Sequence, residues 1–102
     1  MALDFAVLGQ NGSPEKTVPI GVDLHHEFVT TAAGLGLARF QEFENYYEDA
    51  EVAVTDLPSL AKQVATFRTR TESIDLRGFL DDLSGLIAYA MSSGKTLHAI
   101  AD

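Results

Sequence analysis

The sequence predicts one α+β domain, in which a small antiparallel sheet packs against three to four helices. Apolar and polar residues alternate near the start of the chain and again over residues 96–101, a pattern typical of strands. Between these ends, apolar residues recur at the spacing of amphipathic helices. The 102 residues contain no internal repeat or low-complexity linker. We therefore expect a single domain over residues 1–102, whose sheet combines an N-terminal hairpin with a C-terminal strand.

The first element is expected to be a β-hairpin. Each strand is marked by three alternating apolar residues: Leu3, Phe5 and Val7 in the first, and Val18, Ile20 and Val22 in the second. The intervening residues 10–14 are rich in turn formers, and Asn11-Gly12 suits a positive φ. Pro19 has no amide hydrogen to donate, which predicts that the second strand lies at an edge of the sheet or is bulged there.

A helix is expected to follow the hairpin and to begin at Asp23. The carboxylate of Asp23 can cap free backbone amides, and the helix dipole favours its negative charge. Gly34 or Gly36 can supply the left-handed residue that ends the helix. The apolar stripe of this helix consists of Leu24, Phe28, Ala32 and Leu35.

A second helical pattern follows, and its apolar stripe consists of Leu37, Phe40, Phe43 and Tyr47. Beside that stripe, Glu42, Tyr46 and Asp49 are spaced by four and three residues, so a helix would place them in one exposed row. Residues 50–55 alternate in polarity over only a few positions. They fit a short strand and an extended connection equally well.

Two longer helices are predicted in the second half of the chain. Thr55 can cap the first, and Pro58 lies in its first turn, where no intrahelical amide bond is lost. Ser73 or Asp75 can cap the second, which Gly94 ends. The inward faces are Leu57, Leu60, Val64, Phe67 and Thr71 in the first, and Leu76, Phe79, Leu80, Leu83, Leu86, Ile87 and Ala90 in the second.

Composition restricts the possible ligands. The formal net charge is −8, which argues against DNA, RNA or an anionic membrane as a direct ligand, because these need local positive charge. The absence of cysteine excludes disulfides and cysteine-type zinc sites. The N-terminus lacks the basic start and apolar run of a secretory signal, and no apolar stretch reaches the ~20 residues of a membrane span. We therefore expect a cytoplasmic protein.

The predicted helix start at Asp23 is the strongest candidate for metal chemistry. On a helix, Asp23, His26 and Glu27 are three to four positions apart and can share a face. A structural zinc site would need a fourth ligand, such as His98 or Asp102. Acidic residues near a helix start are also expected for electrostatic reasons alone, with one histidine of the segment packing where the hairpin meets the helix. A metal-binding module or metal-dependent hydrolase centred on this cluster is therefore the alternative to that structural role.

No other motif predicts catalysis. The segment from Gly94 to Thr96 resembles the end of a phosphate-binding loop. That motif requires a glycine five positions before Gly94, and this position is occupied by Tyr89. Asp81 and Asp82 are adjacent on a predicted helix and diverge by about 100°, so they do not converge as an acid–base pair. The chain has no cysteine nucleophile and no Ser-His-acid signature. We predict a non-enzymatic protein that needs no cofactor.

The segment between Arg39 and Lys62, here called the acidic tract (residues 40–61), contains no basic residue. Its acids are Glu42, Glu44, Glu48, Asp49, Glu51 and Asp56, and its aromatic residues are Phe40, Phe43, Tyr46 and Tyr47. Aromatic side chains can anchor a contact while carboxylates steer a basic partner. The structural alternative is a solvated face that only improves solubility. We predict a site for a basic protein partner, formed by Glu42, Tyr46, Tyr47, Glu48, Asp49 and Glu51.

The length, the acidity and residues 43–49 (Phe-Glu-Asn-Tyr-Tyr-Glu-Asp) resemble small acidic bacterial immunity proteins, the antidotes of polymorphic or contact-dependent growth inhibition toxins. Residues 3–5, 23–27 and 100–102 are similar in layout to such proteins. The resemblance implies a protein that binds a toxin domain, often a basic nuclease, and blocks its active site or substrate channel. A structural homo-oligomer, in which Phe40 and Phe43 pack across a symmetric interface, is a further alternative.

Overall fold

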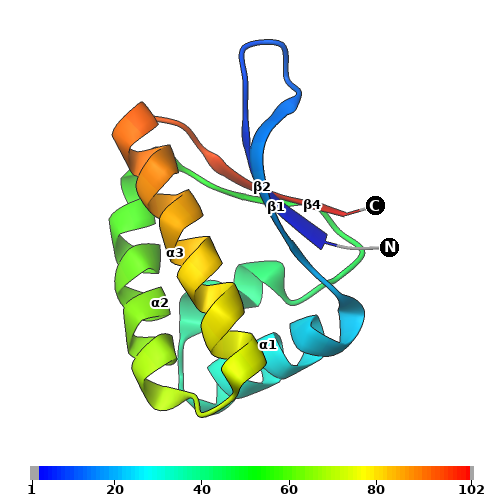
Figure 1. Cartoon of the computed structure of the whole chain (residues 1–102), viewed down its shortest axis with the longest axis vertical. Coiled ribbons are helices and arrows are strands. Elements are labelled where there is room, and N and C mark those ends of the chain that lie inside the picture. Colours follow the sequence, from blue (N-terminus) through cyan, green and yellow to red (C-terminus); the bar gives the residue numbers. More distant parts are fainter. Residues whose placement is uncertain (1–2, 102) are drawn as a thin grey trace.

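The computed structural model describes residues 3–101 and confirms the predicted α+β fold (Figure 1). The elements follow in the order β1 (Leu3–Leu8), β2 (Pro14–Ile20), α1 (Val22–Gly34), η1 (Ala38–Phe43), β3 (Ala50–Val52), η2 (Val54–Asp56), α2 (Leu57–Arg70), α3 (Ile74–Ser93) and β4 (Leu97–Ala101), where η denotes a 3₁₀ helix. The four strands form one antiparallel sheet in the order β2-β1-β4-β3. Helices α2 and α3 lie side by side beside this sheet, and α1 and η1 lie below it in Figure 1.

The predicted hairpin is confirmed, with Leu3 opposite Ile20. Gly12 has the expected positive φ of 79°, and the Asn11 side chain accepts a hydrogen bond from the Ser13 amide at 3.1 Å. Strand β2 is an outer strand of the sheet, as the missing amide hydrogen of Pro19 predicts. Val22, expected in the second strand, instead opens α1.

Residues 50–52 form a short strand and are not merely a connection. Ala50, Glu51 and Val52 pair with Ala99, His98 and Leu97 of β4. The opposite edge of β4 pairs with β1, where Leu3 lies opposite Ala101. The C-terminal strand therefore occupies an inner position and joins β3 to the hairpin.

The helix ends agree with the sequence in part. Ser73 caps α3 through a 3.2 Å bond from the Leu76 amide, and Gly94 ends that helix with φ 64°. Gly36, with φ 72°, follows the end of α1. Two predicted caps are wrong. The N-cap of α1 is Gly21, so Asp23 lies within the first turn of that helix. The 3₁₀ helix η2 runs directly into α2, so Thr55 belongs to η2 and does not cap α2.

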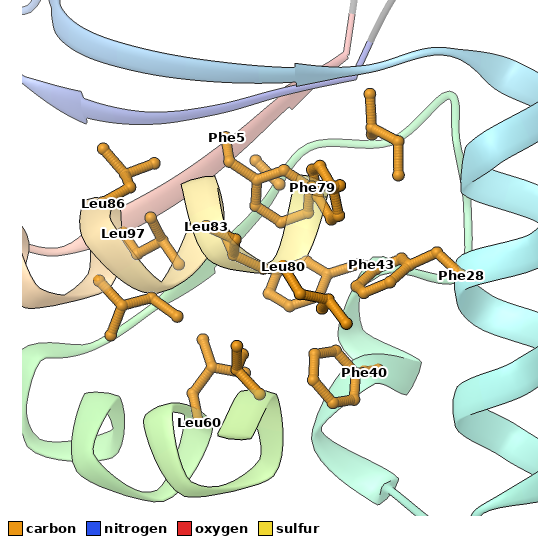
Figure 2. Packing of buried hydrophobic residues seen from close by; sticks show 14 of the residues in the cluster. Phe5, Phe28, Phe40, Phe43, Leu60, Phe79, Leu80, Leu83, Leu86 and Leu97 are labelled. Carbon is orange, nitrogen blue, oxygen red and sulfur yellow. The ribbon is translucent and has the colours of Figure 1, made fainter. Parts of the chain in front are cut away.

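The core lies between the sheet and the helices (Figure 2). Every residue of the predicted inward faces of α2 and α3 is buried. All six phenylalanines of the chain are also buried, and most of their ring pairs meet edge to face. Phe40 and Phe43 are each only 1% exposed. They are therefore core residues, and in this structure they offer almost no exposed area for the symmetric interface that the homo-oligomer alternative assigned to them.

None of the helices within residues 3–101 has both the length and the apolar character needed to cross a membrane.

Candidate partner-binding surface

The backbone of the acidic tract differs from the predicted helix. Residues Ala38–Phe43 form the 3₁₀ helix η1, which has about three residues per turn. Phe40 and Phe43 consequently face the same side, and Tyr46 follows at the same spacing. Tyr46 is only 7% exposed, whereas Tyr47 is 67% exposed. The two tyrosines have thus exchanged the places that the helical pattern predicted for them.

Asn45 forms the turn that points Tyr47 outward. Its side-chain oxygen accepts a hydrogen bond from the Tyr47 amide at 2.9 Å, and its backbone carbonyl accepts one from the Glu48 amide at 3.3 Å. Asparagine favours such turns because its short side chain replaces a backbone acceptor. The sequence signal for this turn was the asparagine itself, which the helical interpretation overlooked.

His25 connects α1 to the acidic tract and was not among the predicted site residues. Its side chain is 4% exposed, and its Nε2 lies 2.6 Å from the backbone oxygen of Phe43. A carbonyl oxygen only accepts, so Nε2 carries the proton and donates, which leaves Nδ1 as the acceptor of the neutral ring. The ring also meets that of Tyr46 edge to face, with 5.0 Å between centroids. One histidine of the segment therefore packs inside, as expected, but it packs against η1.

Four acids of the tract have partners close by. Arg39 lies 3.0 Å from both Glu42 and Asp56. Asp49 accepts a 2.7 Å hydrogen bond from the Ala101 amide, so it fastens the tract to the end of β4. The fourth acid is Glu51, whose carboxylate lies 3.7 Å from a ring nitrogen of His98 on the neighbouring strand.

Glu44 and Glu48 differ from these four acids. Both side chains are exposed, and neither forms an ion pair with any residue between 3 and 101. Tyr47 lies between them in the sequence and is the most exposed aromatic residue of the tract. These three residues are therefore the part of the tract most available to another molecule.

Most of the predicted site residues surround one hollow of about 690 Å³, here called the tract hollow. Its lining includes Glu42, Tyr46, Tyr47, Glu48 and Asp49 from the prediction, together with His25, His26, Glu44 and Asn45. Glu51 lies outside this lining, because it belongs to β3. The structure thus gathers five of the six predicted residues around one concave surface.

The proposed metal cluster is divided between two surfaces. His26 lines the tract hollow, whereas Asp23 and Glu27 line a separate hollow between α1 and α3, here called the α1–α3 hollow. Across residues 3–101, no three histidine, aspartate or glutamate side chains are placed to hold a metal ion. His98 faces Glu51, and Asp102 lies outside the described residues.

The α1–α3 hollow is a second acidic surface. Its carboxylates belong to Asp23, Glu27, Asp75 and Asp82, and it also contains Ile74, which is largely exposed. No tyrosine or histidine lines it. This surface is a useful reference for the tract hollow, because it has similar charge and lacks the tyrosines and histidines.

Comparisons of this chain with models of protein families, with curated proteins and with solved structures gave no match.

Proposed function

We propose that this chain is a non-enzymatic binding protein that neutralises a basic protein partner through the tract hollow. The class of protein that fits best is an immunity protein, which acts in the cytoplasm on a cognate basic toxin domain such as a nuclease. The observation that carries the proposal is that one hollow is lined by the exposed ring of Tyr47 and by Glu44 and Glu48, two carboxylates without ion pairs among residues 3–101. Such a surface matches a cationic partner in chemistry and in charge.

Tyr47 supplies the anchor. A tyrosine ring removed from water on binding contributes a large contact area at small conformational cost, and tyrosine is enriched among the residues that dominate interfaces. The ring of Tyr46 packs against that of Tyr47 with 5.4 Å between centroids and an 89° interplanar angle. Tyr46 therefore supports the anchor from the interior and is not itself an anchor.

The carboxylates supply attraction and discrimination. A net charge of −8 attracts cationic proteins over long distances and repels acidic ones. Glu44 and Glu48 can exchange water for a partner's lysine or arginine without first breaking an ion pair to any residue of the described part of the chain. Asp49 contributes negative charge as well, but its hydrogen bond to the Ala101 amide gives it a structural role.

The test uses a basic toxin domain encoded beside the gene for this chain, with affinity measured by calorimetry and protection measured by growth on co-expression. Glu44→Lys with Glu48→Lys should weaken binding by at least about a hundredfold, because two attractive contacts become repulsive. The matched control is Glu27→Lys with Asp82→Lys, which makes the same change in net charge at the α1–α3 hollow.

Equal losses in the two double variants would show that net charge, and not the tract hollow, determines binding. Unaltered binding in the folded Glu44/Glu48 variant would remove the tract from the interface. A toxin domain that the wild-type chain neither binds nor inhibits would reject the immunity role.

A further inference from the structure

We propose that the partner docks through two neighbouring side chains, an arginine that enters the tract hollow and a bulky apolar side chain that enters a cleft beside it. This inference rests on the proposed function and specifies the chemistry of the partner. It follows from the linings of the two concave surfaces and from the hydrogen bonding of His25.

The second surface, here called the α1–η1 cleft, has a volume of about 320 Å³. Its walls are mainly apolar and come from α1 and the η1 segment: Val29, Ala32, Ala33, Leu37 and Phe40. Ala32 and Phe40 are each 1% exposed, so they form the floor, and the small side chains of Ala32 and Ala33 leave the space open. A cleft of this size and character accepts one large apolar side chain.

The cleft and the tract hollow adjoin each other. Val29, Gln41 and Glu44 line both. A partner that fills the cleft therefore places its neighbouring residues beside the carboxylates, and a single short segment can occupy both spaces. Two linked contacts bind more tightly than either alone, because the second forms at a high effective concentration.

The tract hollow offers mainly hydrogen-bond acceptors. Nε2 of His25 donates to the Phe43 carbonyl, so Nδ1 is the acceptor in the neutral form of the ring, and no hydrogen bond to Nδ1 occurs within residues 3–101. The space that this ring lines is the tract hollow. A donor that enters the hollow therefore meets the His25 ring together with the surrounding carboxylates.

Arginine fits this set of acceptors better than lysine does. A guanidinium has five N–H donors in a planar arrangement, so it can donate to more than one of the acceptors that line the hollow. Its plane can also stack on the exposed ring of Tyr47. A lysine ammonium offers three donors from one point and is more strongly hydrated.

The test is a titration of the ¹⁵N-labelled protein with short acetylated peptide amides, followed by NMR. Each peptide contains one arginine and one phenylalanine, adjacent or separated by one or two glycines, in both orders. The best peptide should bind at least about tenfold more tightly than its versions with arginine replaced by glutamate or phenylalanine replaced by glycine. The shifted amides should lie in residues 25–33 and 37–48.

Two variants test whether the phenylalanine of the peptide binds in the α1–η1 cleft. Ala33→Trp fills the α1–η1 cleft from an exposed helix position and should reduce the benefit of phenylalanine to less than about twofold. Ala65→Trp makes the same substitution at an exposed position of α2 outside the cleft and should leave the benefit unchanged. Circular dichroism of both variants confirms that they are folded.

The inference is overturned if no peptide binds more tightly than its two controls, if the shifts centre on the α1–α3 hollow, or if lysine replaces arginine without loss. It is also overturned, with the proposed function intact, if the toxin domain depends on Glu44 and Glu48 but binds Ala33→Trp like wild type. Peptide binding with the expected dependence, in a protein that binds no toxin domain, would reject the immunity role and leave the two-pocket site standing.

Discussion

His25 holds the acidic tract against α1 with a single hydrogen bond from inside the protein. His25→Phe keeps a ring of similar size but leaves the Phe43 carbonyl without its donor. We expect the free energy of unfolding to fall by about 1–3 kcal/mol, the cost of an unsatisfied buried polar group. Urea denaturation measures this change, with the exposed neighbour His26→Phe as the control, for which we expect a change within about 0.5 kcal/mol. Equal effects of the two substitutions would contradict the role of the hydrogen bond.

The same residue shows what sequence reasoning missed at the site. The segment from Asp23 to Glu27 suggested ligands for a metal, and the structure instead uses one of its two histidines to position the tract. Sequence spacing shows which side chains can share a helix face, but it does not show which element packs against that face. The contact between α1 and η1 is tertiary, so no local pattern could predict it.

At the scale of elements, prediction worked best where the pattern was longest. The α3 stripe runs from Leu76 to Ala90, about four turns, and all seven of its predicted inward residues are buried. The pattern from Leu37 to Tyr47 was too short to separate a period of 3.6 from one of 3.0, because Leu37, Phe40 and Phe43 fit both. The 3₁₀ helix ends at Phe43, and the Asn45 turn that follows leaves Tyr46 buried and Tyr47 exposed, which changed the anchor of the candidate site.

Strand β3 illustrates a different limit. Three residues of alternating polarity carry little information, and this strand exists because β4 lies next to it. The hairpin was predictable because its turn residues are specific, and the partner of Ala50–Val52 was not, because it lies more than forty residues away in the chain.

Helices α2 and α3 are linked on their outer faces by an ion pair with a pH-dependent contribution. Arg68 donates two hydrogen bonds to the Asp81 carboxylate, and this contact holds the pKa of Asp81 below its usual range. A carboxyl group with a lowered pKa in the folded protein stabilises the fold above its unfolded pKa, about 3.9, and loses that contribution as the pH falls through the folded value.

We therefore expect Asp81→Asn to lower the melting temperature slightly at pH 7, with a difference from wild type that shrinks below about pH 4. The effect is small because the pair is exposed. Thermal denaturation followed by circular dichroism between pH 7 and pH 2 measures it. Asp82→Asn, at the adjacent position without an ion pair in the described chain, is the control. If the melting temperature of Asp81→Asn stayed below that of wild type by the same amount down to pH 2, the charge of Asp81 would not be the cause of the difference.

For the molecule as a whole, the excess of negative charge predicts how fast a basic partner associates. Exposed charges act over about 8 Å at physiological ionic strength, and added salt shortens this range. The association rate of the toxin domain should fall by at least about tenfold between about 0.05 and 0.5 M NaCl, while dissociation changes less. Stopped-flow measurements test this expectation. A rate independent of salt would mean that carboxylates do not steer the encounter.

The inner position of β4 also determines when the sheet can form. Hydrogen bonding joins Leu3 to Ala101 across almost the whole chain, and β3 reaches the hairpin only through β4. A growing chain on the ribosome can make its hairpin and its helices early, but it cannot complete the sheet before residue 101 emerges. Contacts this distant in sequence are slow to form. The sheet is therefore completed late, and a variant without β4 would leave the edges of β1 and β3 unpaired together.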